Sequence, residues 1–85
     1  MKFDSGYERI PEFLQKSIED WVEYGITPGH FLQAVISNDL FNAVSYADEG
    51  SMSALKLIVQ FFYNRLPIGC WGPNALTTWP KHLAK

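Results

Sequence analysis

The sequence has a single cysteine, Cys70, only two histidines, and no acidic residue after Glu49. One cysteine cannot form an internal disulfide, and no His or Cys cluster around it gives a metal-ligand spacing. Neither His30 nor His82 is paired by motif with a Ser or Cys nucleophile. GxxxxGK[ST], GxGxxG and HExxH are also missing. We therefore predict a protein that is not an enzyme, with no catalytic residue, cofactor or metal.

Long apolar runs are missing as well. No stretch approaches the ~18–20 apolar residues that a membrane-spanning helix needs. The first ten residues, MKFDSGYERI, lack the apolar segment of a secretory signal. We expect a protein that does not enter the membrane and that resides in the cytoplasm.

Aromatic residues are abundant for a chain of this length. The 85 residues include three Trp, six Phe and four Tyr, and 47% of the chain is hydrophobic. This composition is typical of one small globular domain whose core has little margin of stability. We expect some aromatic side chains to line a pocket or an interface, and we expect a homo-oligomer. The domain is predicted to span residues 10–79, between an N-terminal arm (1–9) and a basic, loose tail (80–85).

Charge is divided unevenly along the chain. Residues 1–49 carry nine acidic and three basic residues, a net charge of −6, whereas residues 50–85 carry four basic residues and no acid, a net charge of +4. The basic half could meet an anion or attract the acidic half of another copy; alternatively, both are solvated faces. The candidate helix over residues 28–47 contains no Lys or Arg, which argues against binding to duplex DNA.

Apolar spacing predicts helices throughout. Pro11 and Glu12 favour a helix start, and Gly25 favours its end. After a turn at residues 49–51, in which Ser51 is a candidate cap, a long helix should end before Pro67, and a short helix is expected over residues 73–79. The predicted fold is an all-α, single-domain bundle of four or five short helices.

The central stretch, residues 27–48, carries the longest apolar helical stripe. Thr27 is predicted to be its N-cap, with Pro28 in the first helical position. Asp39 falls inside the apolar stripe, where an unpaired carboxylate would be costly. Either the helix breaks there, with Asn38 or Asp39 capping a second helix, or Asp39 has a functional role.

A candidate ligand site lies in the acid-free half. Aromatic faces stack on bases, Asn reads hydrogen-bonding edges and Arg binds phosphate, so a nucleotide-like anion would suit this set of residue types. The residues proposed for it are Tyr63, Asn64, Arg65, Trp71 and Trp79, joined by Asn38. The alternative is that both tryptophans belong to the core and that Arg65 is a cation at a helix C-terminus.

The segments YGITPGHFLQAVISNDL, AVSYAD, FFYNRLP and CWG resemble a family of small accessory proteins of bacteriophages and prophages. The matching positions lie within about residues 20–80, among them Gly25, Pro28, Asn38, Asp39 and Trp71. The resemblance carries over no reaction and no catalytic residue. It implies a phage gene product that acts on a host system in the cytoplasm of a bacterial cell.

Two functional hypotheses follow. In the first, a homo-oligomer counters a host defence by sequestering a small nucleotide-like signalling molecule in pockets lined by the region from Tyr63 to Trp79. In the second, the acidic first helix and exposed aromatic residues dock on a host defence protein and block it.

Overall fold

The computed structural model describes residues 1–84, and every regular element within them is a helix. Five α-helices and two short 3-10 helices follow one another along the chain: η1 (Tyr7–Arg9), α1 (Glu12–Tyr24), α2 (His30–Ile36), α3 (Leu40–Tyr46), α4 (Glu49–Arg65), η2 (Ile68–Cys70) and α5 (Ala75–Leu83). The predicted all-α fold is confirmed, with five α-helices. None of these helices combines the length and the apolar character needed to cross a membrane.

Helix α1 begins and ends where the sequence predicts. Pro11 precedes it at the N-cap, and Gly25 ends it in the left-handed conformation, with φ of 68°. The N–H of Gly25 donates to the carbonyl of Trp21, and that of Ile26 to the carbonyl of Asp20. Two carbonyls at the end of the helix are thereby satisfied by the turn that follows it.

The core is organised around Trp21, which has no exposed surface. Its indole Nε1 donates to the carbonyl of Cys70 at 2.9 Å, which ties α1 to η2. Trp79 of α5 donates in turn to the carbonyls of Trp21 and Val22, at 3.2 and 3.1 Å. Each buried N–H needs an acceptor, so these hydrogen bonds hold α1, η2 and α5 together at one point in the core.

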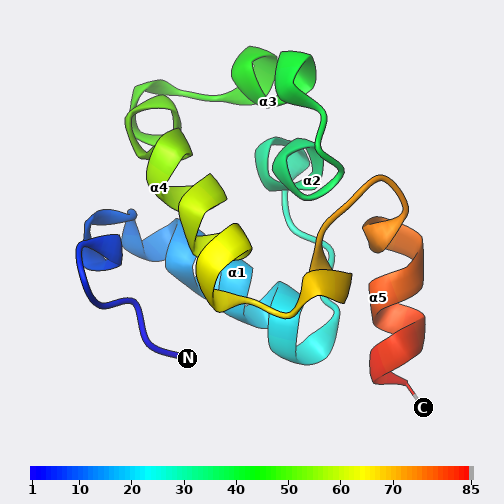
Figure 1. Ribbon diagram of the computed structural model, residues 1–85. Coiled ribbons are helices and arrows are strands. Elements are labelled where there is room, and N and C mark those ends of the chain that lie inside the picture. Colours follow the sequence, from blue (N-terminus) through cyan, green and yellow to red (C-terminus); the bar gives the residue numbers. More distant parts are fainter. Residues whose placement is uncertain (85) are drawn as a thin grey trace.

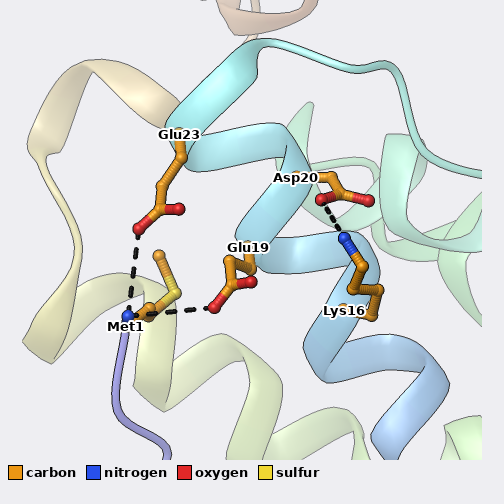
Figure 2. Close-up of polar contacts among 5 residues, drawn as sticks. All are labelled: Met1, Lys16, Glu19, Asp20 and Glu23. Atoms are coloured by element: carbon orange, nitrogen blue, oxygen red, sulfur yellow. Dashed lines mark hydrogen bonds and ion pairs between the residues drawn. The ribbon is translucent and has the colours of Figure 1, made fainter.

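The N-terminal arm packs against α4. The ring of Phe3 stacks on Phe61 with 4.4 Å between centroids, and Tyr7 meets the same ring edge-on at 5.1 Å. The amino group of Met1 lies 3.8 Å from a carboxylate oxygen of both Glu19 and Glu23 on α1 (Figure 2).

The central stretch forms two separate helices, α2 and α3 (Figure 1). The chain turns between them at Asn38. Asn38 has φ of 61°, and its N–H donates to the carbonyl of Val35 while that of Asp39 donates to Ala34. This is the hydrogen-bond pattern of a helix ending in a left-handed residue. Asp39 then caps α3 by accepting from the backbone N–H of Asn42. The structure thus adopts the break that the sequence offered as one alternative.

The predicted start of the central helix at Thr27 and Pro28 is wrong. Helix α2 begins at His30, Gly29 occupies the N-cap, and Thr27 is exposed. The side-chain amide of Gln33 donates to the carbonyl of Pro28 at 2.8 Å. That carbonyl is therefore satisfied by a side chain, and Pro28 stays outside the helix.

Helix α4, in contrast, begins earlier than expected, at Glu49. Its N-cap is Asp48, whose carboxylate accepts from the backbone N–H of Ser51 at 2.7 Å, so Ser51 is buried in the first turn and is not the cap. The hydrogen bond from Ser51 holds the pKa of Asp48 below its ordinary value. An aspartate is as good a cap as a serine, and here it stands three residues earlier.

The loose tail predicted from residue 80 is wrong for residues 80–83, which continue α5; Lys85 lies outside the described residues. Pro80 is held in the helix by close packing against α1. A Cβ placed on Gly25 would lie 3.2 Å from the Cα of Pro80. The glycine that ends α1 therefore also lets α5 approach closely.

We expect the thiol of Cys70 to be unreactive in the folded protein. Its side chain is fully buried, and burial raises its pKa to about 11. The thiolate is the reactive form, so a disulfide reagent at pH 8 should label Cys70 only after denaturation. Rapid labelling under native conditions, at the rate seen in urea, would contradict this burial.

Candidate functional site

A cleft of about 140 Å³ lies where α2, α3 and α4 meet. Its lining is mostly apolar, with a polar edge at the turn between α2 and α3. The side chains from the α2–α3 half are Ala34, Val35, Asn38, Asp39, Leu40 and Ala43. Those from the other half are Leu55, Val59, Phe62 and Tyr63 of α4, together with Trp71. We refer to this feature as the α2–α4 cleft.

The cleft exists because α4 is apolar on two faces. One face, which includes Ala54, Ile58 and Phe61, is buried in the core. A second set of apolar residues, Leu55, Val59 and Tyr63, is spaced by four residues along the helix and lines the cleft. Val59 and Tyr63 remain 49% and 75% exposed. The second face is thus only partly covered by the rest of the chain.

Helix α3 extends this apolar surface. Of its seven residues only Ala43 is buried, whereas Leu40, Phe41 and Val44 are 65%, 88% and 44% exposed. Figure 1 shows α3 at one end of the molecule, connected to α4 by a short segment. A contiguous group of exposed apolar side chains often marks an interaction surface, whereas single scattered ones are common on any protein.

The structure brings together three of the six residues predicted to bind a ligand. Asn38, Tyr63 and Trp71 all line the α2–α4 cleft. The rings of Tyr63 and Trp71 lie 6.2 Å apart between centroids, tilted by 49°. Asn38 is there partly for a conformational reason, since it is the residue whose left-handed backbone ends α2.

The other three predicted residues are engaged elsewhere. Asn64 donates to the hydroxyl of Tyr7 at 3.2 Å. Arg65 pairs with Asp4 at 2.8 Å, and its guanidinium carbon lies 5.2 Å from the centre of the Tyr7 ring. The same pairing lowers the pKa of Asp4. Both α4 residues therefore hold the N-terminal arm.

Trp79 is a core residue, only 7% exposed, with its N–H bonded to α1. Of the two residues assigned structural roles, Asp39 caps α3 and lines the cleft, whereas Thr27 makes no capping bond. Part of the negative charge of α1 is compensated within the helix, because Lys16 pairs with Asp20 at 2.6 Å (Figure 2).

Neither histidine lines the cleft. The ring of His30 packs beside Tyr46, and that of His82 stacks on Trp79. In the part of the chain that the structure describes, no group of three His, Cys, Asp or Glu residues is placed to hold a metal ion.

Sequence reasoning missed the aliphatic side of the cleft: Ala34, Val35, Leu40, Ala43, Leu55 and Val59. Most of these residues belong to the stripes that predicted core-facing helices. One feature of the sequence could have indicated this surface: α4 has more apolar positions than one helix face can hold.

Compared with known proteins, the chain matches no family model, no curated protein and no solved structure. The resemblance to phage accessory proteins therefore stays a prediction.

We expect Asn38 to tolerate glycine but not a β-branched residue. A left-handed conformation costs an ordinary L-residue about 1–2 kcal/mol, and glycine avoids this cost. Asn38→Val should lower the free energy of unfolding by about that amount, whereas Asn38→Gly should leave it nearly unchanged. Urea denaturation followed by circular dichroism measures both. Equal stability of Asn38→Val and wild type would contradict the strained turn.

Proposed function

We propose that this chain is a non-enzymatic binding protein that blocks another protein by receiving one of its apolar side chains in the α2–α4 cleft. The main support for the proposal is that the cleft has the volume of a single apolar side chain and a mostly apolar lining. An engineered protein cavity of about 150 Å³ with an apolar lining accommodates benzene. The cleft, at about 140 Å³, has room for one such ring or a leucine side chain.

Most pockets for small organic ligands are larger, about 300–1,000 Å³, with several polar groups that fix the ligand. The cleft is smaller and has a mainly apolar lining. Protein interfaces commonly depend on one or two apolar anchors that fill such a pocket, surrounded by contacts that exclude water. Helix α3, with Leu40, Phe41 and Val44 exposed beside the cleft, supplies a surrounding surface of that kind.

The resemblance to phage accessory proteins supports a partner from a bacterial host. We propose a host defence protein in the cytoplasm as the target, and inhibition by occupation of its surface as the mechanism.

Sequestration of a nucleotide-like molecule is the second candidate. It is supported by the gathering of Asn38, Tyr63 and Trp71, an amide and two aromatic rings, in one cleft. A nucleotide would need more volume than the α2–α4 cleft of one subunit supplies, together with a cation. At this cleft it therefore requires a pocket completed by a second copy of the chain.

The test is affinity capture from a bacterial lysate with three baits: wild type, Val59→Asp and Gln60→Asp. Both replaced residues are exposed neighbours on α4, but only Val59 lines the cleft. A protein retained by wild type and Gln60→Asp, and lost with Val59→Asp, is the expected result. Calorimetric titration with cyclic and linear dinucleotides forms the second arm. Binding tighter than about millimolar, without any protein lost selectively by Val59→Asp, would favour the second candidate.

A homo-oligomer is expected from the exposed apolar surface of α3. Phe41 is its most exposed large side chain, so Phe41→Ser should shift the equilibrium toward the monomer. Light scattering at micromolar concentration measures this shift, with Ser45→Ala of the same helix as the control. A wild-type protein that is monomeric at 9.7 kDa at every concentration would contradict the expectation.

A further inference from the structure

The α2–α4 cleft has one charged lining residue among those the structure describes, Asp39. Its two carboxylate oxygens accept from Asn42: one from the side-chain amide at 2.6 Å, the other from the backbone N–H at 3.3 Å. A carboxylate can accept about four hydrogen bonds, so two positions stay open. The side chain is half-buried at the edge of an apolar cleft, where a charge interaction is less screened than on an open surface.

Among residues 1–84, no basic side chain forms an ion pair with Asp39. Within residues 1–84, the lysine and arginine ion pairs are those of Lys16 with Asp20 and Arg65 with Asp4, both away from the cleft. Helix α3 contains no cation, and two further acids, Asp48 and Glu49, follow it. The apolar surface of the cleft and α3 is therefore bordered by negative charge at both ends of α3.

We propose that the occupant of the cleft is a segment of a partner protein that carries an apolar anchor side chain with a lysine or arginine beside it. The anchor fills the apolar volume, and the cation reaches the open side of the Asp39 carboxylate. This inference rests on the proposed function and specifies the chemistry of the partner. Charge complementarity of this kind fixes orientation and partner choice more than raw affinity.

A second copy of the same chain fits less well. Its most exposed apolar side chain is Phe41, which lies two residues from Asp39 on a helix without a cation. Insertion of Phe41 into the cleft of another copy would bring a carboxylate toward Asp39, and like charges repel. The observed charges therefore favour a different protein with a basic segment.

The test uses three small probes that share a phenyl ring and differ in charge: 2-phenylethylammonium, 2-phenylethanol and phenylacetate. Each is titrated into ¹⁵N-labelled protein and followed by chemical-shift changes of residues that line the cleft. Asp39→Asn removes the charge but keeps a good N-cap. Asp48→Asn is the matched control, because Asp48 is also an N-cap and does not line the cleft.

With wild type and Asp48→Asn, 2-phenylethylammonium should bind about threefold to fivefold tighter than 2-phenylethanol, and phenylacetate should bind weakest, as expected for a partly exposed ion pair. The preference should disappear in Asp39→Asn and shrink at 1 M salt.

Equal affinity of wild type for all three probes would overturn the charge inference while leaving the apolar docking site in place. A preference for the ammonium that survives in Asp39→Asn would also overturn it. Absence of binding by every probe, 2-phenylethanol included, would instead reject the proposed docking function. If the affinity for the phenyl probes decreases as the protein self-associates, the cleft is occupied by a second copy. That result would contradict the proposal of a partner with a basic segment.

Discussion

Replacing Trp21 with alanine is expected to lower the free energy of unfolding by about 3–5 kcal/mol, the cost of emptying a tightly packed site of this size. Trp21 has no exposed surface, and its N–H satisfies the buried carbonyl of Cys70. The substitution removes the ring and also leaves that carbonyl without its partner. A domain of this length has roughly 4–13 kcal/mol of stability in total, so much of it would be lost.

The measurement is urea denaturation at 25 °C, followed by circular dichroism. Trp21→Phe is a useful companion, since it keeps an aromatic ring and removes the N–H; a buried unsatisfied carbonyl costs about 1–3 kcal/mol. Trp71→Ala is the control on the surface, because Trp71 is only half-buried at the cleft. A Trp21→Ala midpoint close to that of wild type would show that this residue does not organise the core.

Filling the α2–α4 cleft from within is expected to abolish partner binding without loss of stability. In Val59→Trp, the indole would occupy the space offered to the anchor side chain of a partner. Loss of an anchor contact at the centre of an interface commonly costs 2 kcal/mol or more, which corresponds to a decrease of about 30-fold or more in affinity. Because Val59 is 49% exposed, the larger side chain need not disturb the core.

Gln60→Trp provides the matched control, since it adds the same indole to an exposed neighbour on α4 that does not line the cleft. Recovery of the captured partner, quantified by mass spectrometry against wild type, is the readout. The unfolding midpoint of each variant should be measured in parallel. Full recovery by a stable Val59→Trp variant would mean that the partner does not use the cleft.

Much of the fold follows from local sequence signals. Pro11 and Gly25 predict both ends of α1, and Pro67 predicts that α4 ends before it. These residues act through their own backbone geometry, which does not depend on distant parts of the chain. The same reasoning leaves Asn38 ambiguous, because its left-handed conformation is chosen by packing between α2 and α3.

One error occurred where a tertiary contact decides the local structure, and another where a local side-chain contact does. Residues 80–83 continue α5 because Pro80 packs against Gly25, 55 positions earlier in the chain. Thr27 is a good cap by residue type, but the side chain of Gln33 donates to the carbonyl of Pro28 and the helix starts later. Neither contact can be inferred from propensity alone.

The candidate site was predictable in part. Aromatic and amide residues were expected to form a ligand site, and three of them, Asn38, Tyr63 and Trp71, line one cleft. Arg65 was grouped with them because it follows Tyr63 and Asn64 in sequence and an arginine can bind phosphate. On a helix, residues two positions apart point in different directions, and Arg65 instead meets Asp4 of the N-terminal arm. Which face of α4 meets which neighbour depends on the three-dimensional arrangement.

The proposed function requires that the α2–α4 cleft accept a single apolar ring, and methyl NMR can detect such binding directly. Protein labelled at Leu, Val and Ile methyl groups is titrated with 2-phenylethanol. We expect saturable shifts at Val35, Leu40, Leu55 and Val59. Little change is expected at Ile26 and Ile68, which are also apolar and exposed but lie outside the cleft. Equal, non-saturating shifts at all exposed methyl groups, or no shift at the cleft, would contradict it.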